Sequence, residues 1–436
     1  MRQRLRAPIV LPCDPGCSVL RDAVVDIEDD GRIGYVGPLA DAPGDEPVTQ
    51  LSGILMPGLV NTHAHTPMTV LRGMGGDLPL LRWLHEVIWP AEAQLSASDM
   101  AAGMLLGSVE MLRAGVTTSV EMYFNLDKLA EVVLRTGGRA VLTGGIIDAP
   151  GFKLRSLIDD VSRLIDVEGL RFGPGDRIEI GYGPHSAYTL PPEILTEVAA
   201  AAHDRGALMH IHVAEAALED SVQRAEHGSV PKLLESLGFY GGRVIAAHCV
   251  HLSDEDISIF ARHGVAVAHC PGSNAKLASG IARVRDLREA GVTVGIGTDG
   301  PASNDDLDLW EEVRLAALLS RLSTMDASAL IAPDVLLMAT RHGAAAIGRD
   351  DIGAIEQGRW ADLVHISTDA PAFSAGVDVP DAQLLSNVVW AAGARQVEDV
   401  WVAGDKVVED FETTRVDRAE AQALAGAVSQ RLLAGG

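Results

Sequence analysis

Residues 54–65 read I-L-M-P-G-L-V-N-T-H-A-H, an apolar run that ends in two histidines one residue apart. Further short apolar runs follow along the chain, and most are separated by segments whose apolar residues have helical spacing. Alternating strands and helices predict parallel pairing, and eight such units predict an α/β fold, a (β/α)8 TIM-type barrel. An open doubly wound sheet is the alternative. The predicted strands are 54–61, 116–122, 139–147, 177–183, 207–213, 243–250, 265–270 and 292–299.

The two ends of the chain differ from the middle. Residues 1–53 and 353–410 contain short strands broken by turns, and an Ala-rich helix is expected from about Arg418. Two such flanks around one barrel can pair into a single small β-sandwich. The predicted domains are 1–57 and 351–412 as the two parts of the sandwich, 58–350 as the barrel and 413–436 as a C-terminal helix.

Composition and charge argue against several classes of protein. The chain has 436 residues, 47% of them hydrophobic, which is enough for a large core. Its formal net charge of −25 disfavours binding to nucleic acid. No apolar run approaches the roughly 18 residues of a membrane span, and no export site follows the basic N-terminus. We therefore expect a cytoplasmic protein that binds neither nucleic acid nor membrane. Association into a homo-oligomer is possible.

Four residues of metal-binding types fall at the ends of predicted strands. His63 and His65 end the first strand, His212 ends the fifth and Asp299 ends the eighth. Alternate residues of an extended segment point the same way, so His63 and His65 can bind one metal. Three histidines and one aspartate suit Zn²⁺, with Fe²⁺ as the alternative, and leave a position for water. The fourth strand ends at His185 and offers no lysine to bridge a second metal, so a single divalent ion is expected.

Other polar residues surround this set. Glu215 follows His212 by three residues, and His248 ends the sixth strand. We expect His210 to point away from His212, toward the helical layer of the barrel. Each residue alone is also typical of a buried histidine or a surface glutamate. Their gathering at the carboxyl ends of barrel strands, where barrel enzymes carry their sites, indicates an active site.

Several longer motifs carry a family resemblance. They include P-G-L-V-N-T-H-A-H-T-P-M-T-V-L-R-G, G-P-H-S-A-Y-T, H-I-H-V-A-E, A-H-C-V-H-L and G-T-D-G-P-A-S-N-D-D-L-D. Between about residues 20 and 405 the chain resembles the amidohydrolase superfamily, within it the branch of 5′-methylthioadenosine/S-adenosylhomocysteine deaminases and triazine chlorohydrolases. The resemblance implies a metal-dependent deaminase of an adenine nucleoside: methylthioadenosine, S-adenosylhomocysteine, adenosine or another 5′-modified adenosine.

The resemblance also assigns roles to residues. It implies that Glu215, His248 and Asp299 are catalytic, with Glu215 on the ring being deaminated and His248 beside the attacking water. Glu92 matches a ribose-hydroxyl ligand. The remaining implied roles are substrate contact for His185, pocket shaping for Trp89 and Leu71, and metal binding for His63, His65, His212 and Asp299.

One stretch departs from the pattern of relatives that act on S-adenosylhomocysteine. Gly144 and Gly145 occupy the place after the third strand where an arginine for the amino-acid carboxylate is expected. Arg155 lies nearby in the sequence and is the candidate substitute.

Other functions remain open beside deamination of the adenine nucleosides named above. They are deamination of aminodeoxyfutalosine, guanine or a pterin, hydrolysis of a chlorotriazine, or a barrel without catalytic function.

Overall fold

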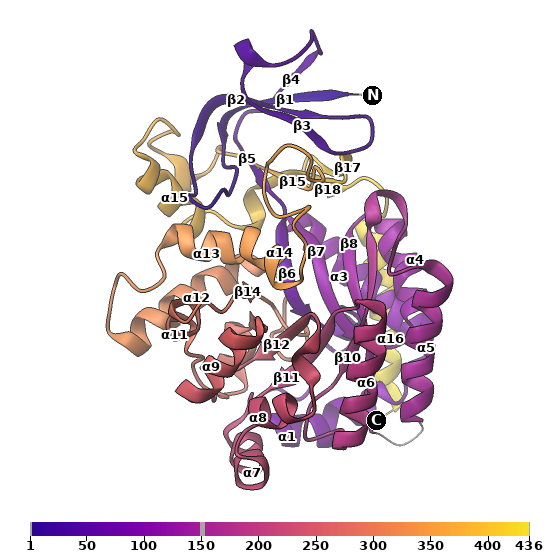
Figure 1. The fold of residues 1–436 in the computed structure, drawn as a ribbon. Helices are drawn as coiled ribbons and strands as arrows, with labels where there is room; N and C mark the ends of the chain where they lie inside the picture. The colour runs from indigo at the N-terminus through magenta and orange to yellow at the C-terminus, as the bar shows by residue number, and fades with distance from the viewer. Residues whose placement is uncertain (1, 149–152, 436) are drawn as a thin grey trace.

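The structure is a computed structural model that describes residues 2–148 and 153–435 (Figure 1). Its central element is a closed barrel of eight parallel strands, in which β14 pairs with β6 and β11 pairs with β10. The predicted fold class is confirmed. The barrel strands are β6 (Leu59–Ala64), β7 (Val116–Tyr123), β8 (Arg139–Ile146), β10 (Ile178–Pro184), β11 (Met209–Val213), β12 (Val244–His248), β13 (Ala266–His269) and β14 (Val294–Ile296), and β9 (Arg171–Phe172) adds a short antiparallel edge to β10.

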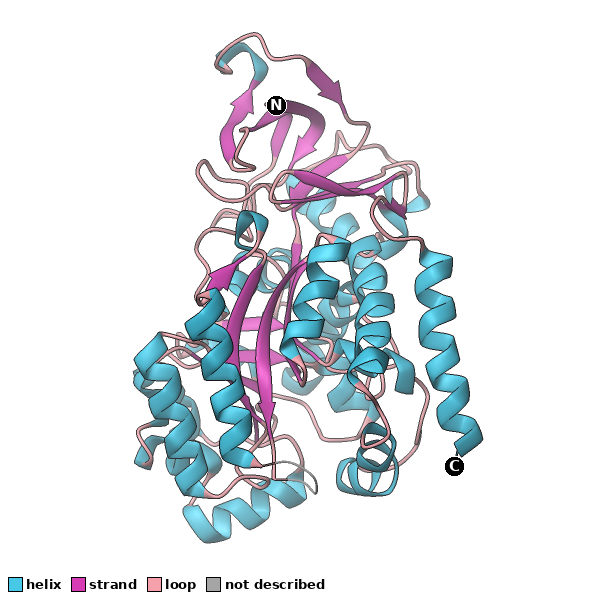
Figure 2. Ribbon diagram, turned by 90° about the vertical axis from the view of Figure 1, so that its right-hand side faces the viewer, coloured by secondary structure: helices cyan, strands magenta, loops and turns pink. Residues whose placement is uncertain are grey.

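Helices connect the strands and cover the barrel (Figure 2). The helix α4 (Leu126–Thr136) shows why they form: Leu126, Leu129 and Val133 repeat at helical spacing on its buried face. The left-handed Gly137 ends that helix. The others around the barrel are α3 (Ala97–Arg113), α5 (Leu154–Glu168), α6 (Pro192–Arg205), α7 (Ala217–His227), α8 (Val230–Ser236), α9 (Asp254–His263), α10 (Pro271–Lys276), α11 (Val284–Glu289), α12 (Leu309–Thr324), α13 (Ala332–Met338) and α14 (Arg341–Ala346).

Strands from both ends of the chain form a second, mixed sheet, as predicted. The antiparallel pair of β5 and β15 joins the N-terminal strands to the C-terminal ones. Leu5, Leu55, Leu363 and Trp401 pack together in the core of this sheet. The predicted domain boundaries stay predictions. The strands are β1 (Gln3–Val10), β2 (Leu20–Ile27), β3 (Ile33–Pro38), β4 (Val48–Gln50), β5 (Ile54–Pro57), β15 (Leu363–Ile366), β16 (Val397–Val402), β17 (Asp405–Glu409) and β18 (Glu412–Thr413).

The first predicted strand is in fact two strands in two sheets. β5 belongs to the mixed sheet and β6 to the barrel, with Gly58 between them. A Cβ on Gly58 would lie 2.1 Å from the hydroxyl oxygen of Thr117, so the chain passes here only without a side chain. The single apolar run therefore crosses from one sheet to the other at Pro57 and Gly58.

The mixed sheet lies against the amino ends of the barrel strands, and the strand arrows point away from it (Figures 1 and 2). Arg139, at the start of β8, donates to both carboxylate oxygens of Asp362 at 2.8 and 2.9 Å. Arg177 donates to the carbonyl of Val402 and to Asp405, both at 2.8 Å. The carboxyl ends of the strands are consequently left for the site.

The last helix, α16 (Arg418–Gly435), packs along α3. The hydroxyl of Ser429 donates to the carbonyl of Val70 at 2.8 Å, and Arg431 pairs with Asp99. None of the described helices is both long enough and apolar enough to cross a bilayer.

Candidate active site

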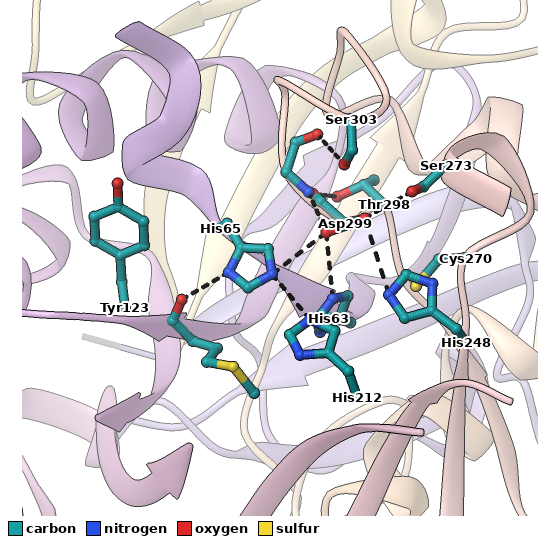
Figure 3. Close-up of polar contacts among 12 residues, drawn as sticks. His63, His65, Tyr123, His212, His248, Cys270, Ser273, Thr298, Asp299 and Ser303 are labelled. Carbon is teal, nitrogen blue, oxygen red and sulfur yellow. Dashed lines mark hydrogen bonds and ion pairs between the residues drawn. The ribbon is translucent and has the colours of Figure 1, made fainter. Parts of the chain in front are cut away.

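The four predicted metal ligands converge at the carboxyl end of the barrel (Figure 3). The Nε2 atoms of His63 and His65 lie 3.3 and 3.4 Å from Oδ1 of Asp299. The Nε2 atoms of His65 and His212 lie 3.3 Å apart. Strand β6, strand β11 and the residues after β14 thus aim their ligand atoms at one point, which is the arrangement a metal ion needs.

Hydrogen bonds to backbone carbonyls fix the tautomers of two of these rings. Nδ1 of His65 lies 2.7 Å from the carbonyl oxygen of Met122, and Nδ1 of His212 lies 2.8 Å from that of His185. A carbonyl oxygen only accepts, so each Nδ1 carries the proton. Each Nε2 therefore presents a lone pair to the shared point, as in metal-bound histidines whose other nitrogen is held by the protein.

A longer chain of hydrogen bonds fixes the third ring. The hydroxyl of Thr143 donates to the carbonyl of Glu121 at 2.6 Å, so its oxygen accepts from Nδ1 of His210 at 3.2 Å. Nε2 of His210 then accepts from Nδ1 of His63 at 2.7 Å. Nε2 of His63 is left with a lone pair and is buried without a hydrogen-bond partner in the described structure. Burial lowers the pKa of His63 to about 4, so the ring is neutral. The residues present therefore fit a zinc ion.

The prediction for His210 is wrong. It faces the same interior as His212 and contacts His63. Residues 210 and 212 are two apart on β11, and side chains two apart on a strand point to the same side. His210 is thus a supporting residue of the site that the sequence reasoning assigned to the helical layer.

Asp299 is held from two sides. The hydroxyl of Ser273 donates to Oδ2 and the backbone N–H of Gly300 donates to Oδ1, both at 2.7 Å. Asp299 itself adopts a left-handed φ of 63°, an uncommon conformation for a non-glycine residue that turns its carboxylate back over the strand ends.

His248 and Glu215 lie beside this group. Nε2 of His248 is 3.7 Å from Oε2 of Glu215 and 4.0 Å from Oδ2 of Asp299. Nδ1 of His248 donates to the side-chain oxygen of Asn274 at 2.9 Å, so its Nε2 is free to accept a proton. Glu215 is almost fully buried, and burial raises its pKa well above the usual range. Burial therefore favours the protonated form of Glu215, which can donate a proton.

These groups open into a cavity of about 580 Å³. The predicted substrate contacts Glu92, His185 and Trp89 line it, whereas Leu71 is buried in the core and is not among the lining residues. The hydroxyl of Tyr123 donates to Oε1 of Glu92 at 2.7 Å, a partner that the sequence reasoning missed. Burial raises the pKa of Glu92, and the bond from Tyr123 lowers it in part.

The rest of the cavity wall is mainly apolar. A helical segment between β6 and α3 supplies much of it through α1 (Leu80–Trp83), the π-helix η3 (Leu84–Ile88) and α2 (Trp89–Glu92). The apolar residues that line the cavity include Trp83, Leu84, Ile88, Met100, Phe124 and Ile147. No lysine or arginine lines the cavity in the described parts of the chain.

Arg155 lies elsewhere. Its side chain is 74% exposed and donates to both carboxylate oxygens of Glu197 at 2.7 and 3.0 Å. The predicted substrate contact by Arg155 is therefore not seen.

Packing explains why glycines occupy positions 144 and 145. A Cβ on Gly144 would lie 2.2 Å from a methyl carbon of Val161 in α5, so no longer side chain fits there. Gly145 lines the cavity, and its Cβ would lie 3.1 Å from the ring of Phe124.

Two further residues of the site were missed from the sequence. Ser273 and Asn274 occupy α10 and hold Asp299 and His248. Both belong to the run A-H-C-P-G-S-N at residues 268–274, to which the sequence alone assigned no role. The signal was a short polar helix directly after a barrel strand, at the end where the site lies.

Comparison with known proteins gives a consistent family. The amidohydrolase family matches residues 54–407. The 5-methylthioadenosine/S-adenosylhomocysteine deaminase of Pelotomaculum thermopropionicum is 38% identical over 434 residues, which are 98% of each chain. The 5′-deoxyadenosine deaminase of Methanopyrus kandleri is 40% identical over 413 residues, 92% of this chain and 93% of the relative.

Solved structures agree. An adenosine deaminase from Xanthomonas campestris with bound zinc has a TM-score of 0.93 and 38% identity, covering 99% of this chain and 98% of that one. The atrazine chlorohydrolase of Arthrobacter aurescens complexed with zinc has a TM-score of 0.88 and 27% identity, covering 98% and 99%. On its sequence, its fold and its strand-end histidines, the chain belongs to the amidohydrolase family.

Proposed function

We propose that the protein is a metal-dependent deaminase that hydrolyses the 6-amino group of an adenine nucleoside, releasing ammonia and the inosine analogue. The observation that carries the proposal is one cavity that combines a histidine–aspartate site for a metal with the buried carboxyl group of Glu215, whose pKa is raised by burial. The two relatives above, named as deaminases of adenine nucleosides, match this chain over nearly its whole length.

The metal-binding residues in this proposal are His63, His65, His212 and Asp299, and the ion is a single Zn²⁺. Burial lowers the pKa of His63 to about 4 and that of His212 well below its usual value, so both imidazoles favour the neutral form that binds a metal. Zinc occurs in the two similar solved structures. When bound, zinc would lower the pKa of a water molecule to about 7 and so supply a nucleophile at neutral pH.

The side chains around the ion move the protons. Water adds across the C6–N1 bond of the purine, with its oxygen bonding to C6. Glu215 donates its proton to N1, which makes C6 more electrophilic. Nε2 of His248, held by Asn274, accepts the proton of the attacking water, and Asp299 lies 4.0 Å away to share it. This proton then passes to the 6-amino group, which leaves as ammonia as the C6–N6 bond breaks. The remaining proton of the C6 hydroxyl returns to Glu215 as the C6 carbonyl forms, so the enzyme is restored.

The far side of the cavity binds the rest of the nucleoside. Glu92 would accept a hydrogen bond from a ribose hydroxyl, because Tyr123 occupies one of its oxygens and leaves the other for the substrate. His185 and Trp89 would pack around the purine and ribose. These contacts fix the substrate without forming or breaking bonds.

We further propose that the 5′ group of the substrate carries no negative charge. Away from the metal site, the described cavity wall offers mainly apolar side chains together with the carboxyl groups of Glu92 and Asp148, but no lysine or arginine. A carboxylate left unpaired in such a wall costs several kcal/mol of binding, on the order of the desolvation penalty of an ion. 5′-Deoxyadenosine and methylthioadenosine therefore fit better than S-adenosylhomocysteine.

A substrate panel tests both proposals. Zinc-loaded enzyme is assayed with 5′-deoxyadenosine, methylthioadenosine, adenosine, S-adenosylhomocysteine, guanine and a chlorotriazine. The expected order of kcat/KM places the first two highest and S-adenosylhomocysteine at least about tenfold lower, a difference of 1.4 kcal/mol. Activity is expected to vanish in chelator and return with zinc. Faster turnover of the chlorotriazine or guanine than of any nucleoside would overturn the deaminase proposal.

A further inference from the structure

Glu312 is a completely buried carboxyl group that has no part in the chemistry above. It lies in the first turns of α12 and is fully inaccessible to solvent. Its Oε2 accepts the backbone N–H of Gly272 at 2.8 Å, and its Oε1 accepts from the side-chain amide of Asn304 at 3.1 Å. Gly272 belongs to α10, after β13, and Asn304 to the loop after β14. One side chain therefore ties together two loops at the carboxyl end of the barrel.

Both loops carry residues that hold the active site. Ser273 and Asn274 directly follow Gly272, and they bond Asp299 and His248 at 2.7 and 2.9 Å. Asn304 follows Ser303, which lines the cavity and donates to the carbonyl of Gly300. A shift of either loop would move Asp299 or His248.

The packing around Glu312 leaves little freedom. A Cβ on Gly272 would lie 2.2 Å from Oε1 of Glu312 and 2.5 Å from the side-chain oxygen of Asn304. The backbone of α10 therefore touches the carboxyl group directly. Burial raises the pKa of Glu312 to about 8, so the group is mostly protonated at neutral pH and resembles the neutral amide of glutamine.

We propose that Glu312 is a positioning residue that sets α10 and the loop after β14 in register, and through Ser273 and Asn274 holds Asp299 and His248 in reactive geometry. This inference rests on the proposed deaminase function. Supporting residues behind an active site commonly contribute 10- to 100-fold to activity or metal affinity, because small displacements of reacting groups are costly.

Three variants test the proposal in the full-length, zinc-loaded enzyme. Glu312→Leu removes both acceptors, and Gly272→Ala pushes against the same contact from the other side. Both are expected to lower kcat about 10- to 100-fold with KM changed less than about threefold. Glu312→Gln keeps the shape and an acceptor for the N–H of Gly272, and is expected to stay within about threefold of wild type. The graded response distinguishes positioning from general loss of stability.

Trp310→Phe is the matched control. Trp310 lies two residues before Glu312 and donates a buried hydrogen bond to the carbonyl of Ala114 at 2.9 Å, away from both loops. It is expected to lower the melting temperature while kcat stays within about twofold of wild type, since the loss of one buried bond costs about 1–3 kcal/mol.

A double-mutant cycle gives the decisive readout. If Glu312 acts through Asn274, Glu312→Leu has little further effect on kcat in an Asn274→Ala background. Simple additivity of the two effects, or wild-type kcat in Glu312→Leu, would overturn the inference. Zinc content is measured for each variant, so loss of the ion is detected separately. If the wild-type enzyme is inactive on every nucleoside, the proposed deaminase function is overturned instead. The positioning role of Glu312 can then still be tested by the zinc affinity of Glu312→Leu, which is expected to fall about tenfold.

Discussion

The two ends of the barrel are both buried and rich in ionisable groups, yet they are built in opposite ways. At the amino end, arginines meet carboxylates: Arg139 with Asp362, and Arg243 and Arg171 with Glu179. At the carboxyl end, imidazoles and carboxyl groups meet each other, and the cavity they line has no lysine or arginine in the described structure. The amino end pairs its charges internally, whereas the carboxyl end leaves imidazole nitrogens and the carboxyl group of Glu215 facing a cavity.

The difference shows how one fold separates stability from function. A charge that is fully paired within the protein has nothing to offer a ligand, but its loss leaves a partner unpaired in a dry interior. A group such as Nε2 of His63, buried without a hydrogen-bond partner among the described residues, contributes little to folding and is available for a metal. Substitutions at the two ends should therefore separate into effects on stability and effects on catalysis.

The largest expected effect is at the carboxyl end. Glu215→Gln removes the proton that we assign to N1 of the purine and should lower kcat about 10²- to 10⁴-fold, with zinc content unchanged. Steady-state kinetics and metal analysis check it. The same substitution at the amino end, Glu179→Gln, is the control and should leave kcat within about twofold. Near-wild-type turnover by Glu215→Gln with its zinc retained would refute the assigned role.

The next effect, on stability alone, is at the amino end. Asp362→Leu leaves Arg139 buried without its bidentate partner and should lower the free energy of unfolding by about 3–5 kcal/mol. The double variant Arg139→Met/Asp362→Leu should regain most of this loss, since no charge is then stranded. Thermal and urea unfolding measure both variants, and kcat should change little. A double variant less stable than the single one would contradict this account of the pair.

The smallest expected effect depends on pH. Burial lowers the pKa of His269 from 6.5 to about 3, so below pH 6.5 the unfolded chain binds a proton there that the folded chain does not. The stabilisation from keeping this ring neutral is complete above pH 6.5 and is lost as the pH falls toward 3. At pH 5 the loss is about 2 kcal/mol.

His269→Gln isolates this contribution. The decrease in stability between pH 7.5 and pH 5 should be about 2 kcal/mol smaller in the variant than in wild type. Urea unfolding at the two pH values measures it, and the comparison between proteins cancels contributions that both share. Identical pH dependence in the two proteins would show that His269 is not the neutral buried ring described here.

Local patterns predicted much of the fold and part of the site. The spacing of apolar runs predicted the barrel strands, and the motifs at their ends predicted the group around Asp299. The run at 54–61 was read as one strand, because nothing in its hydrophobicity marks the change of sheet at Gly58. Arg155 was proposed from nearness in sequence alone, but the structure pairs it with Glu197 on the surface.

Two properties of the protein follow from local patterns of residues. The periodicity of the apolar runs predicts the barrel, and the positions of His63, His65, His212 and Asp299 after those runs predict the candidate ligands. Which partners act on those ligands depends on the packing of the folded chain. Four hydrogen bonds around the site join residues that are at least 26 positions apart in the chain. They connect His210 with His63, Tyr123 with Glu92, His248 with Asn274, and Gly272 with Glu312. Closure of the barrel brings such residues together, and no local pattern encodes which of their side chains meet.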